Sequence, residues 1–179
     1  GTSILAASDD SAVQRNIGFM FNFYGSAYTS AFVSSNGLLA FIGANSLFEN
    51  RDLTGPIDQN LPTIAPLWDD YTVDGSSQVY VETVGAAGSR EFIVQWNNIR
   101  PFSSGALRDR QTFQVRLFEA TNNILFSYLD VDTSRSVDSG NSNGRSATAG
   151  IRDVDGNANR RNLQWGFDGQ FIDSNNPNQ

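Results

Sequence analysis

Apolar side chains recur at every second position in several short stretches of the chain. The stretch IGFMFNF, residues 17–23, places an aliphatic or aromatic side chain at each alternate position. Residues 111–119 follow the same pattern, with Phe113, Val115 and Leu117 on one face. Such alternation is typical of a strand that buries one face. No stretch keeps the i, i+3, i+4, i+7 spacing of an amphipathic helix over three turns.

Further apolar runs, separated by turn residues, extend this pattern along the chain. Asn36-Gly37, the dipeptide that most strongly favours a hairpin, separates two of the runs. The sequence predicts strands at residues 17–23, 31–35, 38–42, 63–68, 78–84, 90–99, 111–119, 124–129, 147–151 and 163–167. Many short strands with closely spaced turns favour a sandwich or a barrel. We expect an all-β fold, an antiparallel β-sandwich with long polar loops, whose core includes Trp68 and Trp96.

Three polar segments interrupt the strands, at residues 46–60, 100–110 and 131–146, and we expect them to be loops. The length of 179 residues indicates a single domain. We expect this domain to span residues 1–172. Residues 173–179, with the sequence DSNNPNQ, are expected to form a C-terminal linker or tail.

The composition excludes several classes of chemistry. Cys and His are both absent, and every basic residue is Arg. Disulfides, thiolate or imidazole metal sites, Ser-His-Asp triads and Schiff-base lysines are therefore excluded. The net charge of −7 repels phosphate backbones, so we expect no nucleic-acid partner. No apolar run reaches the length of a membrane span, and we expect no membrane insertion. The oligomeric state stays open.

The stretch APLWDDY, residues 65–71, places two adjacent carboxylates directly after a tryptophan. Neighbouring residues of a strand point to opposite faces, whereas a glycosidase pair faces its substrate across a cleft. Asp69 and Asp70 are therefore interpreted first as acceptors of backbone N–H groups where the strand ends. A cation site completed by Asp74 and a catalytic pair are the two alternatives.

Two further segments carry oxygen-bearing side chains in clusters that could bind calcium. The stretch DVDGNAN offers these side chains at alternate positions: Asp153, Asp155, Asn157 and Asn159. Gly156 and Gln164 depart from the EF-hand pattern, and Asp-Gly is equally good turn chemistry. The polar loop after residue 129 offers a second set: Asp130, Asp132, Asp138, Asn141 and Asn143. Calcium is the cofactor that these alternative sites suggest.

Trp165, in the stretch LQWGFDG, is the candidate ligand-binding aromatic residue. An exposed Trp beside Asp and Asn can stack on the face of a sugar while the polar groups bind its hydroxyls. The alternative is that the indole closes one end of the sandwich.

The order of these segments resembles a known family. The segments are FYGSAYTSAFVSSNGLLAF, LPTIAPLWDDY, VYVET, FIVQWNNI, TFQVRLFE, ILFSY and ATAGI, and they lie within residues 19–167. Together they resemble the nidogen-like extracellular (NIDO) domain found in basement-membrane nidogen, some mucins and tectorin. Similar segments occur in secreted bacterial surface proteins, and the absence of cysteine makes this sequence resemble the bacterial type.

The resemblance implies a secreted, mostly-β module within a larger adhesive or matrix protein, without catalytic residues. We therefore expect a non-catalytic extracellular interaction module of a secreted or cell-surface protein, with a protein or glycan ligand. Two alternatives remain. One is a glycan-binding, lectin-like module. The other is a hydrolase that uses carboxylates alone.

Overall fold

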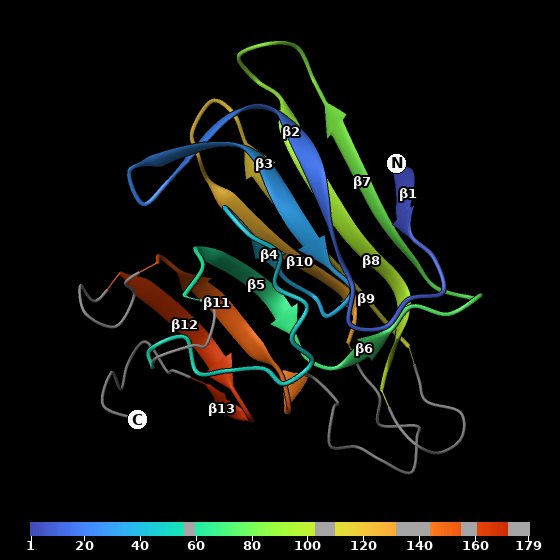
Figure 1. Ribbon diagram of the computed structural model, residues 1–179. Helices are drawn as coiled ribbons and strands as arrows, with labels where there is room; N and C mark the ends of the chain where they lie inside the picture. The colour runs from blue at the N-terminus through green and yellow to red at the C-terminus, as the bar shows by residue number, and fades with distance from the viewer. Residues whose placement is uncertain (56–59, 103–109, 132–143, 155–160, 172–179) are drawn as a thin grey trace.

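The computed structural model describes residues 1–55, 60–102, 110–131, 144–154 and 161–171 (Figure 1). The described chain forms two antiparallel sheets that pack face to face, which confirms the expected all-β sandwich. The strands are β1 (Thr2–Leu5), β2 (Ala12–Phe23), β3 (Ser26–Ser34), β4 (Leu39–Ala40), β5 (Thr63–Trp68), β6 (Tyr71–Thr72), β7 (Gln78–Val84), β8 (Glu91–Pro101), β9 (Gln111–Phe118), β10 (Ile124–Asp130), β11 (Thr148–Arg152), β12 (Asn162–Phe167) and β13 (Gln170–Phe171).

The first sheet has the strand order β1-β7-β8-β9-β10, and β6 also pairs with β8. The central strands β8 and β9 place their apolar residues directly opposite one another. Trp96 pairs with Phe113, and Val94 pairs with Val115. Because these pairs share one face, the first sheet presents a continuous apolar surface to the second sheet.

The second sheet has the order β13-β12-β11-β5-β4-β3-β2. Its β3–β4 hairpin turns at Asn36-Gly37, as the sequence predicts, with Val33 paired to Leu39. Gly37 has a φ of +77°, and a Cβ at this position would lie 2.0 Å from the carbonyl oxygen of Leu67. Only glycine fits this turn, because both the backbone conformation and the close approach of β5 exclude a side chain.

The core lies between the two sheets and contains the predicted apolar faces. On β2, Ile17, Phe19, Phe21 and Phe23 are buried, and the residues between them are exposed. The inward faces of β8 and β9 are buried as well, including Trp96, Phe113, Val115 and Leu117. The period-2 prediction for these strands is therefore confirmed.

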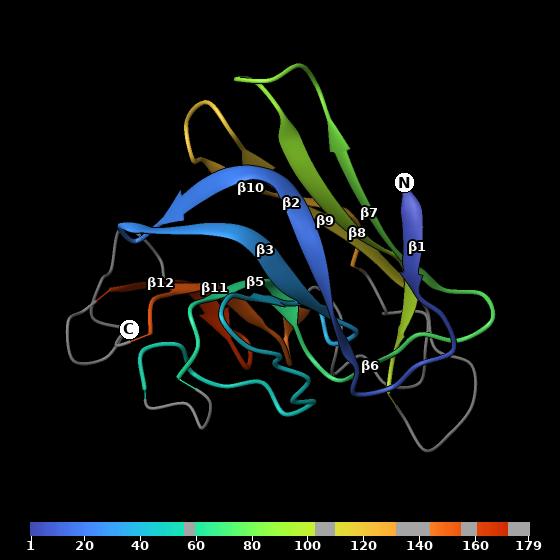
Figure 2. The same cartoon turned by 45° about the horizontal axis from the view of Figure 1, so that its top comes forward.

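A second, smaller apolar cluster lies on the other face of the second sheet. It contains Leu53 and Trp68 together with Leu38, Ala40 and Ala65. The indole Nε1 of Trp68 donates a hydrogen bond to the carbonyl oxygen of Leu47, at 2.9 Å. The chain that precedes β5 covers this face, opposite the first sheet (Figure 2). β5 is thus buried on both faces, which explains its continuous apolar sequence.

We call residues 45–55, which precede β5, the covering segment. Arg152, at the end of β11, is also buried beneath it, with 2% of its surface exposed. Its guanidinium donates to the carbonyl oxygens of Leu53, at 3.3 Å, and Gly55, at 2.5 Å. It also donates to the Oδ1 atom of Asn60, at 3.1 Å. Much of the segment predicted as a polar loop at residues 46–60 is therefore fixed to the sheet by apolar packing and by one buried cation.

Each predicted strand lies on an observed strand, but the sequence prediction missed three short ones. These are β1, β6 and β13, and the first residues of β2 and β3 were missed with them. β6 and β13 have two residues each, and β1 has four. Elements of this length carry no detectable periodicity, so their pairing is decided by the neighbouring strand.

Replacing Trp96 with Ala should lower the free energy of unfolding by about 3–5 kcal/mol, because it opens a cavity in the core. The Trp96→Phe variant should lose about 1–3 kcal/mol, because it leaves the Ser34 carbonyl without the indole N–H that now lies 2.8 Å away. Urea denaturation measures both values. Near wild-type stability of Trp96→Ala would contradict the assigned core.

Candidate functional site

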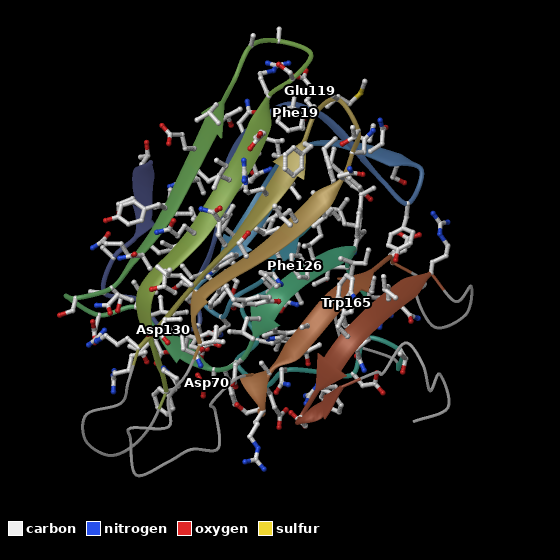
Figure 3. All side chains as sticks on the ribbon, turned by 180° about the vertical axis from the view of Figure 1, so that it is seen from behind. Phe19, Asp70, Glu119, Phe126, Asp130 and Trp165 are labelled. Carbon is white, nitrogen blue, oxygen red and sulfur yellow. The ribbon has the colours of Figure 1, made fainter. Side chains whose placement is uncertain are left out.

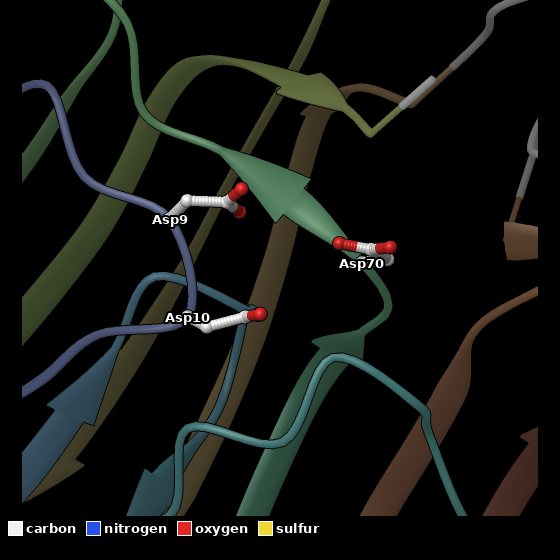
Figure 4. A group of neighbouring side chains, drawn as sticks. All are labelled: Asp9, Asp10 and Asp70. Atoms are coloured by element: carbon white, nitrogen blue, oxygen red, sulfur yellow. The ribbon is translucent and has the colours of Figure 1, made fainter. Parts of the chain in front are cut away.

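Three carboxylates from two distant chain segments meet at one site. Asp9 and Asp10 precede β2, and Asp70 lies between β5 and β6. One carboxylate oxygen from each residue lies within 4.8 Å of the others (Figure 4). We call these three residues the carboxylate cluster.

Backbone pairing and one buried amide bring the two segments together. Ser8 and Val73 form an isolated antiparallel bridge, with N–H to O distances of 2.8 and 2.9 Å. The buried side chain of Asn36 donates its Nδ2 to Asp10, at 2.8 Å, and accepts the N–H of Tyr71, at 3.0 Å. The position of the cluster therefore depends on the Asn36-Gly37 turn.

Burial and the neighbouring carboxylates disfavour the ionised forms of Asp70 and Asp9. Burial, and then the charges of Asp10, Asp9 and Asp69, raise the pKa of Asp70 to about 6. Burial and the charge of Asp10 also raise the pKa of Asp9. Converging oxygen ligands of this kind suit a hard cation such as calcium. Asp9 and Asp10 are exposed, and exposed acidic groups also occur together without an ion.

The adjacent residues Asp69 and Asp70 have different environments. Asp69 is 7% exposed, and its Oδ1 atom accepts the N–H of Asp70 at 2.9 Å. Its other oxygen accepts the hydroxyl of Ser146. The local contacts of Asp69 thus match the strand-end acceptor interpretation, whereas Asp70 points into the carboxylate cluster.

Asp74 forms an ion pair with arginine instead of joining the cluster. Arg110 donates to its two oxygens at 2.9 and 2.7 Å, and the Nε of Arg100 lies 3.5 Å away. The hydrogen bonds from Arg110 hold the pKa of Asp74 well below its usual range. Sequence reasoning grouped Asp70 with Asp69 and Asp74 and missed Asp9 and Asp10, whose only local signal is the SDDS stretch.

The remaining metal candidates lie elsewhere. Asp153 is buried, and its Oδ2 atom lies 3.1 Å from the Nε of Arg161, whose guanidinium stacks over Tyr24. Asp130 is exposed at the end of β10. The other predicted ligands of these two loops fall outside the described residues: Asp132, Asp138, Asn141, Asn143, Asp155, Asn157 and Asn159.

A cleft of about 650 Å³ opens between β10 of the first sheet and β11–β12 of the second. The first sheet contributes Ile124, Phe126 and Tyr128, and the second contributes Ile151 and Trp165. Phe126 and Trp165 face each other across the opening (Figure 3), in an edge-to-face arrangement with ring centroids 5.4 Å apart. Trp165 is 43% exposed, so it neither belongs to the closed core nor lies free on the surface.

Small residues make room for the cleft, and its polar groups are few. Gly144, Ala147, Ala149 and Gly166 line it where the rest of the sandwich interior carries larger side chains. The Tyr128 hydroxyl donates to the carbonyl oxygen of Pro66, at 2.6 Å. Asn122 accepts the backbone N–H of Asn22, at 2.8 Å. Apart from these groups, Asn123 and the indole N–H of Trp165, the lining is apolar, so the cleft offers a mostly apolar surface.

A family model described as NIDO related matches residues 1–166. The chain belongs to the NIDO-related family. The match extends from β1 into β12 and includes both the carboxylate cluster and the cleft. No curated protein and no solved structure matches the chain.

The nidogen-like resemblance of the ordered sequence segments is therefore confirmed. Domains of this NIDO-related kind are typically extracellular. Within its described residues, the domain has no helix with the length and apolarity needed to cross a bilayer.

Replacing Asp70 with Asn should stabilise the NIDO-related domain at neutral pH by about 1 kcal/mol, after allowance for solvent screening. The pKa of Asp70 is raised from 3.8 to about 6, so between these values the folded state binds more protons than the unfolded state. Stability is therefore lost as pH rises through this window, and the variant avoids that loss. Denaturation at about pH 4 and about pH 7.5, in the presence of a chelator, measures the difference in the free energy of unfolding between the wild type and the variant.

Asp74→Asn is the matched control, because its effect has the opposite sign. Because the pKa of Asp74 is lower in the folded state than in the unfolded state, its ionised carboxylate stabilises the fold at pH values above the unfolded-state pKa. This stability is lost as the pH falls toward the folded-state pKa. The variant should therefore be destabilised at neutral pH by about 1.5–3 kcal/mol. A destabilised Asp70→Asn under the same conditions would show that the carboxylate cluster is not under repulsion.

Calcium binding stays a prediction, and thermal melting against calcium concentration checks it. Binding to the folded state at ten times Kd would add about 1.4 kcal/mol. We expect this gain in the wild type and in Asp74→Asn, but not in Asp70→Asn, which loses one ligand of the cluster. A gain kept by Asp70→Asn and lost by Asp153→Asn would place the ion at the other loop. No gain in the wild type would exclude a folded-state calcium site in this range.

Proposed function

We propose that this NIDO-related domain is a non-catalytic interaction module of a secreted or cell-surface protein, and that it binds a protein partner through the apolar cleft. The observation that carries the proposal is the half-exposed Trp165, held against Phe126 at the mouth of the cleft. Exposed aromatic residues in concave apolar sites are typical of interaction surfaces, where a Trp often contributes much of the binding energy.

The chemistry of the cleft favours an apolar side chain over a sugar. Its volume of about 650 Å³ lies within the range of sites that bind small ligands. A glycan site also needs several polar groups that are free to bind hydroxyls. The Tyr128 hydroxyl and the Asn122 Oδ1 already bond to other parts of the chain, and Asn123 is the other amide side chain of the described lining, so a sugar has few partners there. The lectin-like alternative is therefore less well supported.

The distribution of acidic residues supports a non-catalytic role. A hydrolase that uses carboxylates alone needs two of them on either side of a bound substrate. None of the described residues that line the cleft is Asp or Glu. The carboxylate cluster comes from other elements, the segment before β2 and the β5–β6 connection. The apolar cleft and the carboxylate cluster are thus formed by different elements, which supports a non-catalytic role.

Selection of peptides from a phage-displayed library of random linear sequences tests the proposal. Peptides that bind the wild type should bind Trp165→Ala and Ala149→Phe at least roughly tenfold more weakly, a difference of about 1.4 kcal/mol. The first variant removes the aromatic anchor, and the second fills the cleft. Met20→Ala is the control, because Met20 is 61% exposed on β2 and lies outside the cleft.

Two results would contradict this function. One is the failure to select any peptide, and the other is binding that neither cleft variant weakens. A glycan array and a screen of glycosidase and esterase substrates, run on the same protein, test the two alternatives. A bound glycan that depends on Trp165 would favour the lectin-like module, and turnover lost in folded Asp70→Asn would favour the hydrolase.

A further inference from the structure

We infer that the partner is bound as an extended segment that adds to the open edge of β10 and inserts an apolar side chain into the cleft. This inference rests on the proposed function and names the form in which the partner is recognised. It follows from the backbone of β10, from the side chains of that strand and from the charge of the domain.

β10 ends the strand order of the first sheet, so one side of its backbone has no neighbouring strand among the described residues. The β9–β10 hairpin closes with the N–H of Phe118 donating to the carbonyl oxygen of Asn123, at 3.1 Å. In an antiparallel ladder, alternate residues direct their N–H and C=O groups toward the partner strand. Leu125 and Ser127 therefore bond to β9, whereas Phe126 directs its backbone groups to the open side.

The residues that direct backbone groups to the open side also line the cleft. By the same alternation these residues are Ile124, Phe126 and Tyr128. A strand added to β10 would continue the first sheet, and every second side chain of that strand would enter the cleft between β10 and β11–β12. Main-chain hydrogen bonds and an apolar pocket for alternate side chains together form the β-strand addition mode of peptide recognition.

β10 has fewer of the features that protect other sheet edges. Edge strands are usually kept short, bulged or charged. β1 has four residues, and β2 carries Arg15 and a register shift between Asn16 and Phe21. β10 has seven residues with the sequence ILFSYLD, and its register shift is confined to its last residues. Its outer face exposes Leu125, at 43%, and Leu129, at 84%.

The net charge of the domain favours a segment of another protein over a second copy of the domain as the occupant of the β10 edge. The chain carries a net charge of −7, so two copies that meet edge to edge repel each other. Asp130 adds a carboxylate at the end of β10. The same field attracts a segment with Arg or Lys beside its apolar anchor. The occupant assigned to the edge is therefore a basic, extended segment of another protein.

The selected peptides provide the test, through methylation of each backbone nitrogen in turn. Strand addition predicts an alternating pattern, in which methylation at every second residue weakens binding at least roughly tenfold and methylation between them changes little. Replacing basic residues of the peptide should also weaken binding, most strongly at low salt. Amide exchange on the domain gives an independent readout. The peptide should slow exchange at Phe126 and Tyr128, whereas Leu125 and Ser127 are already bonded to β9.

The outcomes separate this inference from the proposed function. Peptide binding that depends on Trp165 but shows no alternation, or no protection at Phe126, overturns strand addition and leaves the cleft as the binding site. Failure to select any peptide overturns both. Concentration-dependent protection of Phe126 without peptide, together with a dimer in sedimentation, would assign the edge to a second copy.

Discussion

The buried turn at Asn36-Gly37 is the constraint on which the sandwich depends. Gly37 approaches β5 so closely that a Cβ would lie 2.0 Å from the Leu67 oxygen. Next to it, the fully buried Asn36 bonds to Asp10, to the carbonyl oxygen of Ser46 and to the N–H of Tyr71. One turn thus fixes the β3–β4 hairpin against the end of β5, the segment before β2 and the covering segment. A buried polar group is stable here because each of its amide atoms has a partner.

The two candidate sites arise from opposite departures from ordinary sandwich packing. At the carboxylate cluster, hydrogen bonds from a rigid turn hold like charges together. Elsewhere in the sandwich, the stacked rings of Trp96 and Phe113, with centroids 5.1 Å apart, fill the space between the sheets. At the cleft, small residues leave this space unfilled. At the first site burial and neighbouring carboxylates raise the pKa of Asp70, and at the second site apolar surface stays in contact with water.

The sequence predicted the features that local pattern controls. The alternation of apolar and polar residues predicted which faces of β2, β8 and β9 are buried, and Asn36-Gly37 predicted a hairpin. Asp9 and Asp70 could not be paired from the sequence, because about sixty residues separate them and a two-residue bridge brings them together. Asp74 had the same local pattern as a metal ligand, but it pairs with Arg110, which lies just before β9 and is distant in sequence. Trp165 was singled out from its local sequence, but which side chains surround it depends on how the two sheets meet.

The covering segment before β5 has a consequence for how the domain comes apart. It looks like a surface loop in sequence, yet its removal would expose the indole of Trp68 and leave the charge of Arg152 without the carbonyl oxygens that now solvate it. Opening thus exposes apolar surface and breaks several hydrogen bonds at once, while the guanidinium keeps the carbonyl oxygen of Asp153 as an acceptor. Opening of this segment is therefore coupled to opening of the sheet, and cleavage by a protease between Asn45 and Gly55 would report global unfolding rather than local fraying.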